Sequence, residues 1–261
     1  MKKVKIVRSL VFAVLSLLFA CLPKQPELPL SEVPAGPLLQ ALEQRRQSFT
    51  GLKAVAGVTA VRKGRKRAFD NVGIVLASQD RLRIEAYGPL GQSLLAMVWD
   101  GREVLLRLPG QDRVVRPGAA GLERLFGAGL DVQELCAALS GNVPPVPVTA
   151  VVSAACGRGE LCELTIRQGD LVRRVQVVNH PSGSGPKFAP VISELYRNGK
   201  LVYRARFEQV AELAHYLMPG AVIIENPEKN FSLTIGYAEV DVNVPIDEAL
   251  FSLPDEEAGA F

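Results

Sequence analysis

Apolar and polar residues alternate along most of the chain after residue 50, and clusters of Gly, Asn, Asp and Pro separate the alternating runs. Such alternation predicts β-strands buried on one face, because successive side chains of a strand point to opposite sides. The clearest runs span residues 82–87, 93–99, 104–108, 201–210 and 231–242. No regular alternation of strands with helices is present. We therefore predict a mainly β (α+β) fold, a half-open antiparallel β-barrel of about 11 strands.

Helical spacing of apolar residues is restricted to two regions. Residues 38–49 predict an amphipathic N-terminal helix that packs against the sheet. Between Pro117 and Leu139 the spacing predicts two short helices, with Asp131 as a favourable N-cap of the second. Residues 179–187 are rich in Pro, Ser and Gly and are expected to form a flexible connection. The periodicity leaves open whether the two short helices form a lid or fill the core.

The N-terminal residues predict export. Cationic residues precede an apolar run, Leu10–Ala20, which is too short to span a bilayer and has the layout of a secretory signal. We therefore divide the chain into a signal peptide at 1–20, a Pro-rich tether at 21–37, one domain at 38–254 and a polar tail at 255–261.

The junction Leu18-Phe19-Ala20-Cys21 resembles the lipobox of bacterial lipoproteins, which implies a diacylglycerol on the Cys21 thiol. The alternative is an ordinary signal followed by a coincidental cysteine. Leu22, rather than an aspartate, follows Cys21, and this favours an outer-membrane address.

One connection between predicted strands has an unusual composition. Gly88, Pro89, Leu90 and Gly91 place a large apolar side chain at the tip of a loop, where turn chemistry favours Gly, Pro, Asn or Asp. An exposed leucine lowers solubility and contributes nothing to the turn. Leu90 either folds back onto its own sheet or serves a function outside the fold.

The sequence RIEAYGPLGQSLLAMVWDGREVLL (residues 83–106), followed by a Gly- and Leu-rich region and by LSGNVPP (139–145), resembles the LolB family of outer-membrane lipoprotein receptors. The resemblance covers about residues 50–145. It implies that Leu90 projects from the barrel and helps to place lipoproteins in the outer membrane. It also implies an apolar cavity for lipoprotein acyl chains beneath a helical lid. The candidate cavity and lid residues are Leu82, Ile84, Leu95, Met97, Trp99, Leu122, Leu125, Phe126 and Leu135.

The resemblance further implies a lipid-anchored protein on the periplasmic side of the outer membrane, with a soluble periplasmic carrier similar to LolA as a partner. One alternative is a lipid or lipopeptide binding module in envelope assembly that performs no lipoprotein transfer. An envelope enzyme acting on lipids is disfavoured, because His180 and His215 are the only histidines and no nucleophile elbow or phosphate loop occurs. We therefore expect no enzyme activity, no cofactor and no metal site.

The cysteines and the charges refine this prediction. Cys156 and Cys162 flank a turn between two predicted strands, a spacing suited to a disulfide in an oxidising compartment, whereas a metal site would need a second ligand pair. Cys136 is expected to be buried as a small apolar residue. A net charge of +3 is too small and dispersed to indicate a nucleic-acid partner. The basic run at 62–67 predicts a solvated hairpin or, alternatively, a contact with anionic headgroups.

Overall fold

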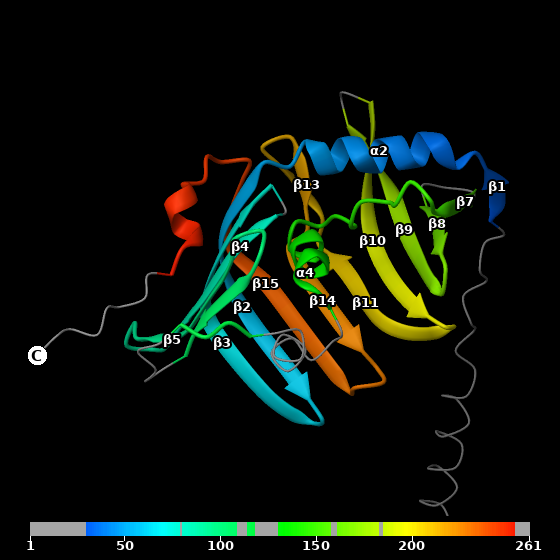
Figure 1. Cartoon of the computed structure of the whole chain (residues 1–261). Coiled ribbons are helices and arrows are strands. Elements are labelled where there is room, and N and C mark those ends of the chain that lie inside the picture. Colours follow the sequence, from blue (N-terminus) through cyan, green and yellow to red (C-terminus); the bar gives the residue numbers. More distant parts are fainter. Residues whose placement is uncertain are drawn as a thin grey trace, which may run out of the picture.

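The computed structural model describes residues 30–78, 80–108, 114–117, 130–157, 161–182 and 185–253. The predicted signal peptide, Cys21, the lid residues Leu122, Leu125 and Phe126, and the polar tail lie outside these residues. Within them, one strongly curved antiparallel sheet has the strand order β1-β7-β8-β9-β10-β11-β14-β15-β2-β3-β4-β5-β6 (Figure 1). The sheet does not close, because β1 and β6 form its two edges. The prediction of a mainly β, half-open antiparallel fold is confirmed, with thirteen strands in this sheet rather than about eleven.

The strands of the large sheet are β1 (Ser31–Val33), β2 (Gly51–Arg62), β3 (Arg65–Ala77), β4 (Arg81–Tyr87), β5 (Ser93–Trp99), β6 (Val104–Arg107), β7 (Val151–Cys156), β8 (Leu161–Gln168), β9 (Leu171–Ser182), β10 (Gly185–Arg197), β11 (Lys200–Glu208), β14 (Ala221–Asn226) and β15 (Phe231–Val242). A separate hairpin pairs β12 (Ala211–Leu213) with β13 (Tyr216–Met218). Burial follows the sequence alternation in strands such as β14, where every second residue is buried. The alternation therefore places one face of these strands in the core.

Two segments differ from the sequence prediction. Within the segment expected as a flexible connection at 179–187, the described residues 179–182 and 185–187 belong to strands β9 and β10, which pair with each other. The expected tether also ends earlier, because β1 pairs with β7 and joins the sheet. Helix α2 (Ala35–Gln47) then begins three residues before the predicted start at residue 38. In both cases pairing with a neighbouring strand determines the backbone, despite local Pro and Gly residues.

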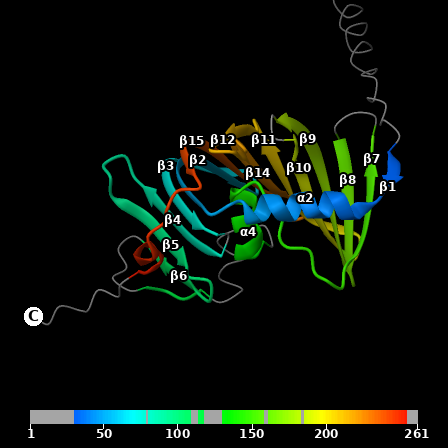
Figure 2. The ribbon, with the colours of Figure 1, turned by 90° about the horizontal axis from the view of Figure 1, so that it is seen from above.

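The two described helices cover different parts of the concave face. Helix α4 (Val132–Leu139) lies within the curve of the sheet, whereas α2 spans the side formed by β7 to β10 (Figure 2). Asp131 caps α4 as predicted, because its carboxylate accepts a hydrogen bond of 2.7 Å from the Glu134 backbone N–H. The 3₁₀ helix η1 (Glu248–Phe251) packs on the outer face, where Phe251 joins Val98 and Leu105.

Two separate apolar clusters fill the concave side. The larger one joins α4 to the strands β2 to β6, β11 and β13 to β15. The smaller one joins α2 to β7, β8 and β9. The concave face is thus divided into an α4 half and an α2 half, and we use these two terms below.

Candidate functional site

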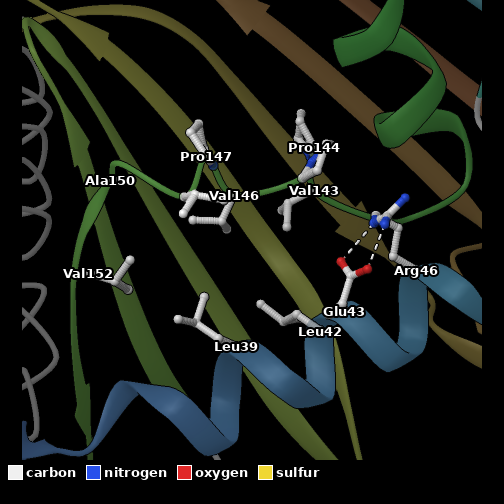
Figure 3. Close-up of a pocket in the computed structure, with 12 residues that line it drawn as sticks. Leu39, Leu42, Glu43, Arg46, Val143, Pro144, Val146, Pro147, Ala150 and Val152 are labelled. Atoms are coloured by element: carbon white, nitrogen blue, oxygen red, sulfur yellow. Dashed lines mark hydrogen bonds and ion pairs between the residues drawn. The ribbon is translucent and has the colours of Figure 1, made fainter.

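The α2 half contains an open pocket of about 470 Å³. Helix α2 forms one wall, and the extended segment 143–150 with the start of β7 forms the other (Figure 3). Leu39 and Leu42 on α2 point toward Val146 and Val152 on the opposite wall (Figure 3). The lining residues are Leu39, Leu42, Glu43, Arg46, Val143, Pro144, Pro145, Val146, Pro147, Val148, Ala150 and Val152. Ten of these twelve lining residues are apolar, and Glu43 and Arg46 are charged.

The Pro-rich segment explains why this space remains open. Pro144, Pro145 and Pro147 have no backbone N–H, so they cannot supply the donors that strand pairing requires. The segment crosses the concave face as an extended chain that forms neither a helix nor a strand. It presents small branched and cyclic side chains, and these leave a cavity between the segment and α2.

One ion pair on α2 provides the charged groups of the pocket. Arg46 donates from Nε to Glu43 Oε2 over 2.9 Å and from NH2 to Glu43 Oε1 over 2.6 Å. The hydrogen bond from Arg46 lowers the pKa of the Glu43 carboxyl, and Gln47 contributes a further hydrogen bond. Because the two charges neutralise each other at one end of the pocket (Figure 3), this wall combines an apolar surface with a polar border.

The α4 half is filled by its helix over most of the curve, and open space remains at its edge beside Trp99. Leu135, Cys136 and Leu139 of α4 are fully or almost fully buried in the larger cluster. Glu134 forms a buried ion pair with Arg173 of β9 and accepts a hydrogen bond from the Tyr203 hydroxyl of β11. The Arg173 guanidinium also donates to Tyr203 over 2.8 Å. The carboxylate on α4 is thus satisfied by groups on two strands of the sheet.

Hydroxyl groups also bind the C-terminal end of α4. The last carbonyl groups of a helix have no partner inside the helix. Here Tyr237 donates to the Leu139 carbonyl and Tyr216 donates to the Ser140 carbonyl, each over 2.7 Å. Asn142 donates to the Tyr216 hydroxyl. The helix therefore packs as an integral part of the core rather than as a loose cover.

Arg45 lies at the junction of the two halves. Its guanidinium donates to the Gly141 carbonyl and to the Leu217 carbonyl, and it stacks 4.4 Å from the centre of the Tyr216 ring. Burial lowers the pKa of this guanidinium, and Tyr216 opposes that change. Arg45 thereby links α2 to the segment after α4 and to β13.

The described cavity candidates occupy the α4 half. Leu82, Met97, Trp99 and Leu135 are buried in the larger cluster, and Ile84 and Leu95 pack against it half-buried. The register pairs Leu82 with Trp99, Ile84 with Met97 and Ala86 with Leu95, so the strand candidates share one face of the sheet. Trp99 also lines a second pocket of about 470 Å³ together with Arg102, Arg116 and Val132. None of these candidates lines the pocket beside α2.

The residues of the α2 pocket were not selected from the sequence. Leu39 and Leu42 belong to the predicted amphipathic helix at 38–49, and Pro144 and Pro145 belong to the sequence LSGNVPP, but none of them was predicted to line a pocket. A usable signal is the run of alternating Val and Pro at 143–148, because such a run is extended, apolar and unable to pair as a strand.

The loop at residues 88–91 holds Leu90 in solvent. The Leu90 side chain is 92% exposed. Gly91 N–H donates to the Gly88 carbonyl over 2.9 Å, and Gly88 N–H donates to the Gln92 carbonyl over 2.8 Å. Gly91 has a φ of +78°, which glycine adopts without strain. The loop therefore satisfies its own backbone while the leucine stays outside the core.

The cysteines occupy two different environments. Cys156 and Cys162 form a disulfide across the β7–β8 hairpin. Cys136 is a free thiol that is buried in α4, and burial raises its pKa well above the usual range. No group of three or more potential metal ligands occurs within the described ranges. In the part of the chain that the structure describes, no helix is long and apolar enough to cross a membrane.

No protein-family model matches the sequence, and neither does any curated protein. Solved structures do resemble the fold. A DUF1329 family protein from Desulfovibrio piger has a TM-score of 0.62 at 11% identity, with 84% of this chain and 97% of that chain covered. A LolA superfamily protein from Nitrosomonas europaea has a TM-score of 0.55 at 12% identity, with 85% and 98% covered.

A structure described as an outer membrane lipoprotein-sorting protein domain, from Vibrio parahaemolyticus, has a TM-score of 0.54 at 11% identity, with 84% of this chain and 97% of that chain covered. Identities this low establish a common fold and nothing more. The chain therefore has a fold similar to that of these three structures, one of which is a LolA superfamily protein.

Proposed function

We propose that this protein binds the acyl chains of lipoproteins in the pocket beside α2 and helps to insert them into the outer membrane, as the LolB-like sequence pattern implies. The observation that carries the proposal is the apolar pocket of about 470 Å³ between α2 and residues 143–152. Its volume lies within the range of roughly 300–1,000 Å³ that is typical of small-molecule sites. The fold that holds it is shared with a lipoprotein-sorting domain.

The physical basis of this function is burial of apolar surface without chemistry. Each methylene group that leaves water for an apolar pocket contributes about 0.8 kcal/mol. Transfer from a soluble carrier similar to LolA then requires only a small difference in affinity. The Glu43–Arg46 ion pair would lie near the polar end of a bound lipid. The proposed role is therefore binding and transfer rather than catalysis.

The membrane location forms part of the same proposal. A diacylglycerol on Cys21 would anchor the protein to the periplasmic side of the outer membrane, with further acylation at the new N-terminus. More than one acyl chain is needed, because a single chain gives only marginal and reversible anchoring. Leu90, exposed at the tip of its loop, would enter the membrane interface during delivery.

A pocket-filling variant tests the binding step. Leu39 lines the pocket and is half-buried, so Leu39→Trp should fill part of the space. We expect a fluorescent fatty acid to bind this variant about tenfold more weakly, which corresponds to about 1.4 kcal/mol. Gln40→Trp is the matched control, because Gln40 is an exposed neighbour outside the pocket lining. Equal affinity in both variants, with both folded, would contradict the proposed pocket.

A loop variant tests the delivery step. Leu90→Glu should leave the melting temperature nearly unchanged, since an exposed residue leaves no cavity when it is replaced. It should impair release of bound lipoprotein into liposomes, because a carboxylate resists transfer into the apolar boundary. Leu90→Met is the matched control and should retain transfer. If the native chain binds the fatty acid but transfers no lipoprotein into liposomes, the result would favour the alternative of a lipid or lipopeptide binding module.

A further inference from the structure

The strand register places five connections at one end of the sheet. These are the turns β2–β3 at 63–64, β4–β5 at 88–92, β8–β9 at 169–170, β10–β11 at 198–199 and β14–β15 at 227–230. Neighbouring turns are bonded to each other. Lys63 N–H donates to the Asn230 carbonyl over 2.9 Å, and Asn198 N–H donates to the Asp170 carbonyl over 3.0 Å. We call this end of the sheet the turn rim. In Figure 1 the arrow of β2 points to it, at the lower edge of the sheet.

The most exposed apolar side chains of the described residues all lie on the turn rim. Leu90, Val148 and Val151 are 92%, 103% and 69% exposed, whereas the other exposed large apolar residues reach at most 42%. Val151 pairs with Arg167, immediately before the β8–β9 turn. Val148 lies in the turn that precedes β7, beside Thr149, whose hydroxyl is 3.4 Å from the amide nitrogen of Gln168. These residues form two separate exposed apolar sites along the rim, Val148 with Val151 near β7 and Leu90 after β4.

The turn rim also carries the basic run of the sequence. Lys63, Arg65, Lys66 and Arg67 are exposed on the β2–β3 hairpin. Within the described residues, none of the four forms an ion pair, although salt bridges occur on many other strands. In the strand order, β2 and β3 lie between β7, which carries Val151, and β4, which leads to Leu90. The cations thus lie beside the strand that leads to Leu90, whereas six other strands separate them from Val151.

We propose that the turn rim is a docking face for an anionic phospholipid bilayer. The β2–β3 cations would contact phosphate headgroups, while Val148, Val151 and Leu90 enter the interface. A cation near an anionic membrane strengthens binding by about 1 kcal/mol, which is roughly fivefold. Contacts at three positions along a curved rim also hold the sheet in one orientation. This inference rests on the proposed function in two respects. It takes a membrane as the target, and it uses the membrane contact proposed for Leu90.

The orientation has a consequence for the pocket beside α2. Val148 both lines that pocket and stands on the turn rim. Docking would therefore bring the pocket opening to the bilayer surface. A bound acyl chain could then leave the pocket toward the membrane without crossing bulk water, in which each exposed methylene group is unfavourable.

A fluorescent probe on the rim tests the docking. The full-length chain with Val148→Cys, labelled with an environment-sensitive fluorophore, is reconstituted into vesicles of phosphatidylglycerol and phosphatidylethanolamine or of phosphatidylcholine alone. The chain without the added cysteine gives the background, since Cys136 is buried and the other described cysteines form a disulfide. We expect a blue shift on the anionic vesicles only. A label introduced by Leu213→Cys, in the β12–β13 hairpin at the opposite end of the sheet, should not respond.

Charge reversal identifies the groups responsible. Arg65→Glu with Lys66→Glu should lower the docking equilibrium by about 25-fold, or fivefold for each cation. Lys53→Glu with Arg102→Glu is the matched control, because both side chains are exposed at the opposite end of the sheet. Three results would overturn the proposal. The two pairs of substitutions could weaken docking equally, the fluorescent label could respond equally on neutral vesicles, or its response could require an added soluble protein. Fatty-acid binding in solution should not change in either variant, so a failure of the pocket proposal is seen separately.

Discussion

The α4 half and the α2 half of the concave face use the same sheet but are covered in opposite ways. In the α4 half a helix fills the curve, and its carboxylate and terminal carbonyls are bonded to Arg173, Tyr203, Tyr216 and Tyr237. In the α2 half the covering segment is Pro-rich and extended, and it leaves a pocket. The difference shows that the apolar face of a strand does not define a cavity. What packs against that face decides whether space remains.

The comparison predicts that the α4 half depends strongly on its polar contacts. Glu134→Ala leaves the largely buried Arg173 guanidinium without its carboxylate, and the loss should approach the roughly 3–5 kcal/mol that breaking a fully buried pair costs. Glu43→Ala, in the more exposed pair of the α2 half, should cost less than about 1 kcal/mol. Urea unfolding of both variants measures the difference. Equal losses would show that the two halves are not distinguished by these ion pairs.

The disulfide of the α2 half should have the next largest effect. Cys156→Ser with Cys162→Ser removes a short covalent loop, whose chain entropy accounts for about 2 kcal/mol. This loss of stability should be local, so the backbone amides of β7 and β8 should exchange hydrogen faster than those of α4. Cys136→Ser serves as a contrast in the other half, because it places a hydroxyl in an apolar core. Uniform loss of protection in both halves after the disulfide is removed would mean that the halves unfold together.

A single hydroxyl group sharpens the comparison further. Tyr237→Phe removes the hydrogen bond to the Leu139 carbonyl at the end of α4, and we expect a loss of about 1 kcal/mol. Tyr196→Phe, whose hydroxyl binds Glu194 in a part-buried position, should cost only a few tenths of a kcal/mol. Thermal melting measures both. A larger loss in Tyr196→Phe would contradict the view that tyrosines hold α4 in the core.

The smallest predicted effect is a pH dependence of the α2 half. The folded-state pKa of Glu43 is lowered, chiefly by the hydrogen bond from Arg46. A carboxyl of this kind contributes stability above its unfolded pKa of about 4.3, and this contribution is lost as the pH falls through the lower folded value. Because the pair is partly exposed, the contribution should stay below about 1 kcal/mol. Glu43→Gln should reduce the loss of stability between pH 5 and pH 3, and an unchanged acid profile would refute this assignment.

The sequence by itself determined the strands and several turns, whereas the outward position of Leu90 was implied only by the resemblance to the LolB family. Alternation with a period of two is local, and the Asn198-Gly199 turn has positive φ at both residues, as its composition predicts. Asp131 likewise caps α4 through a local hydrogen bond. These features depend on neighbours a few residues away. They were therefore predictable without knowledge of the fold.

Only the tertiary structure decided where the concave face is filled and where it is open. Leu82, Met97 and Trp99 were predicted to line a cavity, and they do share one face of the sheet, but α4 packs against that face. The pocket beside α2 joins Leu39 to Val146 and Val152, more than a hundred residues apart in the chain. The pairing of residues 179–182 with 185–188 also depends on non-local partners, because β8 and β11 flank β9 and β10 and extend the sheet. Such contacts form only after distant segments meet, so no local pattern specifies them.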